Sequence, residues 1–480
     1  MIKNILPLVV ILSVALLRGQ DIAIEPIFFG IHRSTGGIWQ GETKPTYFAG
    51  WGIQGEVAYG RWTLQADLIN MRFFGLRGLP NRFSPEQGFS WQQHATGVPE
   101  EFDTDYSSVI MAYEIGGFKA LLGKFSQNWG PGLHSLTMSA KPPTYPQFGF
   151  EWRLTEKLRF IYLHGELFSG IIDTLRTPLN IGLVGGQIIY LDRYIAAHRL
   201  EWCPVDWLTI GLMESVVYGA RSIETVYLMP FVLYWSAEHY LGDTDNVQMS
   251  ADLTWRPHPG LKLYGVFLMD EWRPQDTFKE TNRNWFAWQG GLDWRSVLLD
   301  EDRLVAEATW TDHRILRHRF PINDFYSHGY LTRYGYISEN GHLYNPGYPV
   351  GHWTGAHAQS LFMAYILPRW GSRFMVSYLY AKRGELTWDM LVDQYNSIPY
   401  ERFSGSTETV QTFDVTVGRP VWKKLWVELG FSLINWNNAG FDPSKPEVSN
   451  GNDVNKTSIT AGFYYNFNFP GYLTTLLQAQ

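Results

Sequence analysis

Few side chains of this sequence are spaced for bond-breaking chemistry. His134 and Ser135 are adjacent, and neighbouring side chains of an extended segment point to opposite faces, so they cannot easily share a proton. His313 and His318 do not have the i,i+4 spacing of an HExxH zinc helix, and the 13 histidines show no ligand cluster. The stretch 182–186 lacks the strand, helix and acidic partner of a dinucleotide loop. We therefore expect no catalytic residue, no cofactor and no metal site.

Sugar binding is the chemistry for which the sequence is better equipped. Aromatic planes contact the C–H faces of pyranose rings, and Asp, Asn, Arg and His bind their hydroxyls. The polar segment from Thr311 to Trp353 combines both kinds of side chain. Its expected polysaccharide-binding residues are Tyr326, Tyr330, Arg333, Tyr334, Tyr336, Tyr344 and Trp353. The alternative is that these aromatics pack the loop on itself, inside the fold, because loops of this length are usually self-packed.

Residues 1–20 have the features of a secretory signal peptide. Lys3 provides a positive start, and 5–17 is an uncharged apolar run that ends before Arg18. A single membrane anchor is the alternative, but this run is shorter than the roughly 20 residues that a spanning helix needs. No Cys lies near the expected cleavage site at Gly19 or Gln20, which excludes a lipoprotein. The sequence therefore predicts export.

The composition favours a membrane barrel. After the signal no stretch approaches 18 consecutive apolar residues, so helical membrane spans are not expected. Yet 16% of the residues are aromatic, and transmembrane barrels place Trp and Tyr in girdles at both membrane interfaces. The net charge of −7 becomes −9 when Lys3 and Arg18 are removed, which gives no basic footprint for nucleic acid. The single cysteine, Cys203, cannot form an internal disulfide and is expected to be structural.

Apolar and polar side chains alternate with a period of two along much of the chain. Apolar residues occupy the even positions of 61–68 and the odd positions of 247–255 and 425–433. Segments of about ten residues with one apolar and one polar face are typical of a barrel with lipid outside and a polar lumen. A β-sandwich also alternates, but it does not explain the signal, the aromatic excess and the number of segments together.

Short turns that contain proline alternate with long polar stretches, as in an up-and-down barrel whose long loops face outside. The turns lie at 202–207, 255–260, 367–371 and 418–422. We predict an all-β transmembrane antiparallel barrel of about 16 to 18 strands. It spans 46–469, after an N-terminal segment (21–45) of unassigned structure and before a tail (470–480). The strand 458–467 is expected to close it.

Two features are expected to shape the interior of this barrel. The Trp129-Gly130-Pro131-Gly132 segment cannot continue a strand ladder, so the chain should leave the wall there and turn inward, with ligand contact as the alternative. Charges on the wall should point inward, because a Lys or Arg facing lipid at the midplane costs about 2 to 4 kcal/mol. The residues expected in such a lumenal charge network are Arg199, Glu201, Glu214, Arg221, Asp270 and Glu271.

The segment 123–136 resembles the G-[KR]-x(4)-WGPG-x(3)-L motif of the Wzi-type capsule-assembly family. Its matching positions are Gly123, Lys124, Trp129, Gly130, Pro131 and Gly132. Two further blocks, 199–231 and 246–272, are also similar, and the resemblance covers about 47–467. It implies an outer-membrane barrel of about 18 strands that attaches or organises capsular polysaccharide in a lectin-like role, without catalytic residues. Enterobacterial members carry a helical plug, whereas 21–45 shows no helical period.

The sequence therefore predicts a protein of the outer membrane of a Gram-negative cell, with surface polysaccharide and membrane lipid as its partners. A monomer is the simplest expectation. A porin-like diffusion channel for small solutes is the main alternative, and a barrel enzyme is the weaker one. A channel would conduct in planar bilayers and leave a capsule untouched, which separates it from the polysaccharide-binding reading.

Overall fold

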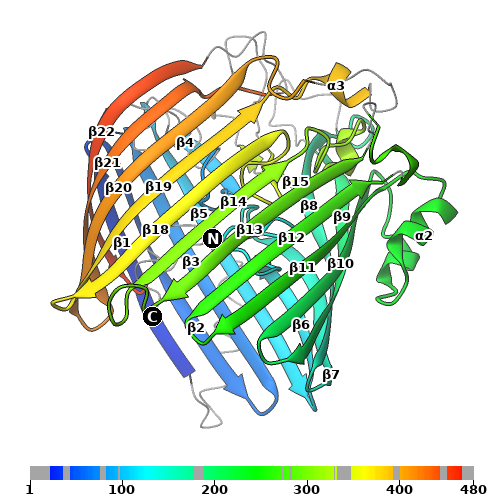
Figure 1. The fold of residues 1–480 in the computed structure, drawn as a ribbon, viewed down its shortest axis with the longest axis horizontal. Coiled ribbons are helices and arrows are strands. Elements are labelled where there is room, and N and C mark those ends of the chain that lie inside the picture. The colour runs from blue at the N-terminus through cyan, green and yellow to red at the C-terminus, as the bar shows by residue number, and fades with distance from the viewer. Residues whose placement is uncertain are drawn as a thin grey trace.

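A single closed wall of strands makes up most of the molecule (Figure 1). The computed structural model describes residues 22–35, 44–75, 83–95, 98–177, 189–272, 274–279, 284–328, 330–331, 347–392, 401–443 and 451–467. The wall strands are β1 (Ile22–Arg33), β2 (Thr46–Tyr59), β3 (Trp62–Phe74), β5 (Val98–Ile115), β6 (Phe118–Phe125), β7 (Tyr145–Thr155), β8 (Leu158–Ile172), β9 (Tyr190–Val205), β10 (Leu208–Gly219), β11 (Asn246–His258), β12 (Leu261–Glu271), β13 (Trp285–Arg295), β14 (Arg303–Thr311), β18 (Ala358–Arg369), β19 (Ser372–Gly384), β20 (Thr407–Trp422), β21 (Leu425–Ala439) and β22 (Asn452–Tyr465).

The remaining elements are short and lie in the connections. They are β4 (Trp91–Ala95), β15 (Tyr326–Ser327), β16 (Tyr330–Leu331), β17 (Tyr348–Pro349), η1 (Thr225–Leu228), α2 (Tyr234–Tyr240), η2 (Pro274–Asp276), η3 (Pro321–Asn323) and α3 (Trp388–Val392). In the described parts of the chain, no helix has the length and apolar character needed to cross a membrane.

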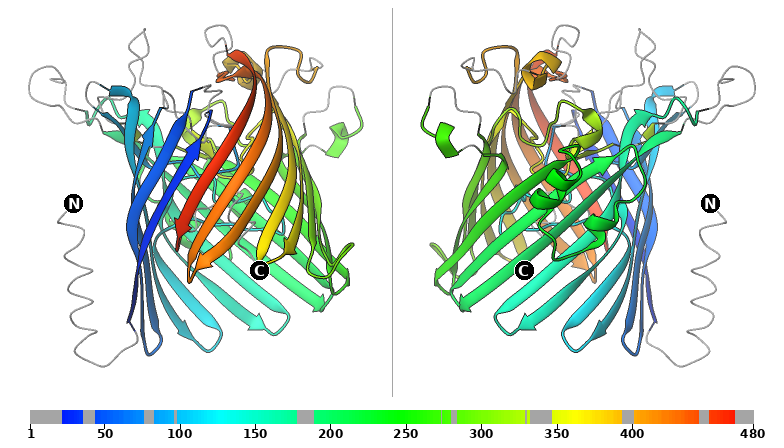
Figure 2. Two further views of the ribbon diagram at one scale, coloured as in Figure 1. Left: turned by 90° about the vertical axis from the view of Figure 1, so that its left-hand side faces the viewer. Right: turned by 90° about the vertical axis from the view of Figure 1, so that its right-hand side faces the viewer.

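The wall closes because the first strand pairs with the last. Each wall strand pairs antiparallel with the next one along the chain, and β1 also pairs with β22, with Phe28 opposite Tyr465. Of the 20 strands in this sheet, β4 and β16 are short additions, so the described residues form an 18-stranded barrel. This confirms the predicted fold class, and the strand number is the upper value of the predicted range. Figure 2 shows the strongly tilted strands from two sides.

Alternating exposure identifies the two faces of the wall. In β20 the side chains of Phe413 and Val415 are 42% and 41% exposed, whereas Thr412 and Thr416 are 3% and 9% exposed. Successive strand residues point to opposite faces, so the exposed apolar residues form the outer, lipid-facing surface and the alternate residues face the lumen.

The barrel begins before the predicted residue 46. The segment 22–33, to which the sequence assigned no structure, is β1, and it pairs with neighbours on both sides. The alternation was hidden because both faces of β1 are apolar: Ile24 and Phe28 face out, while Ile27 and Phe29 are buried in the lumen. The described residues of the N-terminal segment are therefore wall, and not helical plug.

Inward-folded connections fill the lumen. We call the segments 83–90, 126–144, 312–328 and 347–357 the inner plug. Phe83, Phe89 and Trp353 pack in one apolar cluster against the inner wall, and Leu136 and Leu316 pack in a second cluster. The segments also bind one another: the backbone N–H of Ser139 donates to the carbonyl of Val350 (2.7 Å).

A buried lysine ties two plug segments together. The Lys141 Nζ donates to the backbone carbonyls of Ser84 (2.9 Å) and Glu86 (2.7 Å). Burial lowers the pKa of Lys141 to about 7. The described plug is therefore a cross-linked unit built from several loops.

One connection folds to the outside. We call residues 220–245, which contain η1 and α2, the outer flap; it lies against the outer surface of β8–β11 (Figure 2, right). Tyr227, Tyr234 and Ala237 of the flap pack on Val216 and Val247 of the wall. The wall beneath the flap is thus covered by protein and not by lipid.

Candidate functional site

The Trp129–Gly132 turn lies inside the barrel. The chain leaves the wall after β6, and the Trp129 N–H donates to the Met138 carbonyl at 2.8 Å. Gly130 has a φ of +106°, a backbone conformation that favours glycine. The turn crosses to the opposite wall, where the Lys262 Nζ of β12 donates to the Pro131 carbonyl at 2.7 Å. The structure thus contains the inward turn that the backbone chemistry predicts.

Glu307 on the inner face of β14 anchors this turn. Its carboxylate accepts hydrogen bonds from the backbone N–H groups of Leu133 (2.8 Å) and His134 (3.2 Å) and from the Tyr264 hydroxyl (2.7 Å). A Cβ added at Gly132 would lie 2.9 Å from the Glu307 Oε2 atom and 2.4 Å from the Gln289 Oε1 atom. A side chain here would displace the ends of these two wall side chains, so the glycine lets the turn pack closely against the wall.

His134 and His352 both join Glu307. The His134 Nδ1 lies 2.9 Å from the Glu307 Oε1, and one ligand atom from each of the three side chains lies within 4.8 Å of the others. His352 is 1% exposed, and its Nδ1 lies 2.8 Å from the Thr354 hydroxyl. Two imidazoles and a carboxylate could hold a divalent metal ion. The described histidines do therefore include a possible ligand group, contrary to the expectation from the sequence.

Sequence spacing could not have revealed this cluster. Its members come from the 126–144 plug segment, from β14 and from the 347–357 plug segment, which meet only after all three have folded into the lumen. Ser135, next to His134, contacts different groups: its hydroxyl donates to the Trp129 carbonyl and lies 3.5 Å from the Thr137 hydroxyl. In the structure, His134 and Ser135 have separate partners.

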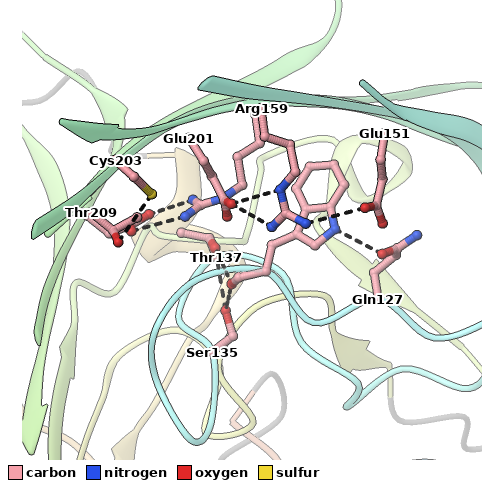
Figure 3. A network of polar contacts seen from close by, with 11 residues as sticks. Gln127, Ser135, Thr137, Glu151, Arg159, Glu201, Cys203 and Thr209 are labelled. Carbon is pink, nitrogen blue, oxygen red and sulfur yellow. Dashed lines mark hydrogen bonds and ion pairs between the residues drawn. The ribbon is translucent and has the colours of Figure 1, made fainter. Parts of the chain in front are cut away.

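A ladder of charges follows the inner wall near the plug (Figure 3). The Arg159 guanidinium bridges Glu151 (3.3 Å) and Glu201 (2.5 Å). The Arg199 guanidinium bonds to Glu201 (2.8 Å) and to Asp252 (2.5 Å). Figure 3 also shows Gln127, Ser135 and Thr137 of the plug beside these wall residues. The structure therefore brings Arg199 and Glu201 together in the lumen.

The other predicted network residues lie elsewhere. Arg221 belongs to the outer flap, where it pairs with Glu224 and Asp245 (both 2.7 Å). Asp270 faces the lumen and accepts a hydrogen bond from Gln248 (3.1 Å), and Glu271 is exposed at the end of β12. The six residues do not form one lumenal network.

The position of Glu214 contradicts the predicted lumenal network most clearly, because its side chain faces outward and not into the lumen. It has the same parity on β10 as Leu212, which is 53% exposed on the lipid side. Its carboxylate nevertheless avoids lipid: it accepts the backbone N–H groups of Tyr234 and Trp235 at the start of α2 (both 2.7 Å) and lies 3.2 Å from the His198 Nε2. The sequence argument failed here because it allowed only lipid on the outer face.

Cys203 and the first two motif residues lie in the wall. Cys203 faces the lumen, with its Sγ 3.6 Å from the Thr209 hydroxyl (Figure 3). Gly123 lies where an added Cβ would come within 1.9 Å of the Val109 carbonyl oxygen, so no larger residue fits. The Lys124 Nζ donates to the Ser107 hydroxyl at 2.7 Å. These positions have structural roles in the wall.

The predicted sugar-binding aromatics are only partly described. Tyr326 is 6% exposed, with the Arg317 guanidinium 3.6 Å from its ring centroid, and Trp353 is 3% exposed in the inner plug. Both side chains are therefore packed inside, as in the alternative reading of this loop. For Tyr330 the backbone alone is described, in β16. Arg333, Tyr334, Tyr336 and Tyr344 lie outside the described residues.

Other aromatic side chains are exposed at the long-loop end of the barrel. They were not singled out from the sequence, because their exposure depends on how each loop folds. Trp272 follows β12, Phe320 precedes η3 and Trp388 begins α3, and their exposed fractions are 54%, 51% and 55%. We call these three residues the rim aromatics.

The closed wall, its apolar outer face and its short turns at one end define an outer-membrane β-barrel. The family model described as "Capsule assembly protein Wzi" matches residues 75–447, which is most of the chain. This protein belongs to that family and is located in the cell outer membrane.

Two solved structures are similar to this chain. Wzi of Escherichia coli, titled a carbohydrate-binding β-barrel involved in group 1 capsule assembly, is 14% identical with a TM-score of 0.50, over 92% of this chain and 85% of that chain. Pseudomonas aeruginosa OpdK with vanillate is 11% identical with a TM-score of 0.48, over 93% and 98%. A comparison with curated proteins gave no match.

Proposed function

We propose that this protein binds surface polysaccharide at the outside of the outer membrane and takes part in capsule assembly, without catalysing a reaction. Its membership of the capsule assembly family, over residues 75–447, is the observation that carries this proposal. The E. coli protein of similar fold is described as a carbohydrate-binding barrel. The inner plug supports binding over diffusion, because packed loop segments occupy the lumen that a channel would need open.

The rim aromatics provide a surface suited to such a ligand. Exposed aromatic faces can cover the C–H faces of pyranose rings. Polar groups lie beside them: the Trp272 Nε1 donates to the Thr277 hydroxyl (3.3 Å), and the Arg319 guanidinium is 4.9 Å from the Phe320 ring centroid. We also include Arg333, Tyr334, Tyr336 and Tyr344 in the proposed surface. These residues lie outside the described part of the chain, and their role rests on the sequence alone.

The proposal is tested in a strain that produces a capsule. Deleting the gene should release glycan into the medium, and the wild-type gene should restore retention. The variant Trp272→Ala/Trp388→Ala should retain less glycan, at normal barrel levels in the outer membrane. Trp370→Ala is the matched control, because Trp370 is 86% exposed in the short turn between β18 and β19, at the opposite end of the barrel.

Two results would contradict the proposal. Full glycan retention in the deletion strain would remove the role in capsule assembly. Ion conductance of the purified barrel in planar bilayers, comparable to that of an open porin, would favour the diffusion channel instead.

A further inference from the structure

The geometry points to a metal site in the lumen, which we propose binds a zinc-like divalent transition-metal ion through His134, Glu307 and His352. This trio is the one group of at least three His, Cys, Asp or Glu side chains in the described part of the chain whose ligand atoms are close enough to share an ion. Two imidazole nitrogens with one carboxylate oxygen form a common zinc ligand set, in which a fourth position is left to water.

The positions of the three side chains suit this role. One ligand atom from each lies within 4.8 Å of the other two, and the His134 and His352 ring planes are 83° apart. Glu307 and His352 are buried, and His134 is half-buried.

Neighbouring groups hold the ligands as they do around known metal centres. The His352 Nδ1 lies 2.8 Å from the Thr354 hydroxyl and 3.4 Å from the Thr354 backbone nitrogen. Binding of a metal through Nε2 requires the proton on Nδ1, which then donates to the Thr354 hydroxyl. The Tyr264 hydroxyl and the Leu133 N–H both bind the Glu307 Oε2 atom (2.7 and 2.8 Å). Hydrogen bonds of this kind to the far side of a ligand fix its orientation and raise metal affinity.

The buried side chain of Gln289 gives independent support for a bound group beside these three ligands. It is 4% exposed, and its Oε1 is a buried acceptor for which the described residues provide no hydrogen-bond donor. This atom and the Glu307 Oε2 both lie within 3 Å of where a Cβ of Gly132 would be. A buried acceptor normally has a donor. The Gln289 Nε2 donates to the His134 backbone carbonyl (2.7 Å), so this unpaired acceptor belongs to a side chain that contacts the proposed site.

The ion would act as a cross-link. It would join the plug segments 126–144 and 347–357 to β14, so that the inner plug is fixed at one point shared by three parts of the chain. No part of this inference depends on the ligand proposed for the outer rim.

Metal binding is measured on the full mature barrel in detergent, purified without a polyhistidine tag and treated with a chelator. Cobalt(II) is the probe, because its absorption band reports tetrahedral coordination. We expect this band to saturate at one ion per chain and to disappear on addition of zinc. Glu307→Gln and His352→Asn should each weaken cobalt binding at least about tenfold. Heat-modifiable migration on SDS gels verifies that each variant is folded.

Two control variants exclude other sites. His239→Ala removes a half-exposed histidine of the outer flap, and Cys203→Ser removes the only thiol; both should bind cobalt like the wild type. Zinc should also raise the unfolding temperature of the wild type but not that of Glu307→Gln. The proposal is overturned if the folded wild type gives no cobalt band, or if folded Glu307→Gln and His352→Asn bind cobalt with wild-type affinity.

Discussion

The Glu214 Oε2 atom, on the outer face of β10, lies 2.7 Å from the backbone nitrogen of Tyr234, the first residue of α2. A carboxylate on the lipid side of a barrel is thus bound by the start of a helix that covers it. The same carboxylate pairs with His198 (3.2 Å). Glu214 therefore holds the outer flap on the wall, and the flap keeps Glu214 away from lipid.

Replacing Glu214 by Ala should loosen the flap. The variant leaves the N–H groups of Tyr234 and Trp235 without their acceptor, a loss of about 1 to 3 kcal/mol for buried donors. Limited proteolysis should cut within 220–245 faster than in the wild type, while the wall stays protected. Glu214→Gln should give an intermediate rate, because its amide oxygen can accept from only one of the two N–H groups. Equal cleavage of Glu214→Ala and the wild type would disprove the anchoring role.

The exposed face of the flap should lie in the outer leaflet of the membrane. Phe231, Leu233 and Trp235 are 65%, 65% and 55% exposed, and the Phe231 ring is 4.8 Å from that of Phe160 on the lipid-facing wall. Brominated lipids quench tryptophans that touch acyl chains, so Trp235→Phe should reduce the quenchable fluorescence. Trp388→Phe is the control, since Trp388 is equally exposed (55%) but lies at the extracellular rim. An equal effect of the two substitutions would argue against this placement.

Attachment of the flap should weaken as pH rises. Burial, together with Asp245, Asp243, Glu271 and Glu214, raises the pKa of Glu238 from 4.5 to about 8. The folded state keeps this carboxyl group protonated to a higher pH than the unfolded state does. Its contribution to the stability of the fold is therefore fully present below about pH 4.5. This contribution is lost as pH rises through about 8.

Hydrogen exchange in α2 measures this effect. Protection, corrected for the intrinsic pH dependence of exchange, should fall between about pH 4.5 and pH 8 in the wild type and stay constant above that. Glu238→Gln should keep its protection over that range, because the amide does not ionise. A wild-type protection that does not change with pH would contradict the expectation.

Arg199 should stabilise the lumenal charge ladder mainly because its guanidinium pairs with the buried Asp252 carboxylate. It is 3% exposed and bonds to Asp252, which is 4% exposed. Arg199→Met should destabilise the barrel by about 3 to 5 kcal/mol, because it leaves the Asp252 carboxylate without its partner. The double variant Arg199→Met/Asp252→Leu should recover most of this loss in urea unfolding of the refolded barrel. A double variant as unstable as Arg199→Met would contradict the argument.

Gly132→Ala should displace the plug turn from β14. The added methyl group would come within 2.4 Å of Gln289 and 2.9 Å of Glu307, whose carboxylate is already fixed by hydrogen bonds. Overpacking of this kind typically costs about 1 to 3 kcal/mol. Protease cleavage within 126–144 should increase. Gly265→Ala is the control, because its Cβ would have just one neighbour, at 4.0 Å; similar cleavage of both variants would count against the tight contact.

The alternation of side chains predicted most of the wall, because lipid and a polar lumen select opposite residue types on successive positions. The prediction from alternation failed where the outer surface does not face lipid or where the lumen is not polar. At β1 the lumen itself is apolar, since Ile27 and Phe29 belong to the cluster that contains Phe83 and Phe89 of the plug. At Glu214 the outside is protein, because the flap covers it. Both exceptions are set by loops whose paths the local sequence does not determine.

The candidate site was less predictable for the same reason. The glycines and proline of 129–132 predicted an inward turn, because a strand cannot continue through them. Which wall residue the turn would reach was not predictable, since Glu307 is far along the chain from His134. The cluster exists only through the tertiary fold.

The pairing of β1 with β22 joins the first and the last wall strands of the described chain in one seam. Beside it, Glu25 binds Lys424 and the Asn466 amide, so the seam is also fastened by side chains. The wall cannot close until β22, the last wall strand along the described chain, has paired with β1, the first. Until then both strands have unpaired edges of the kind that add to neighbouring chains, so closing the wall also removes the sites at which the unassembled chain would aggregate.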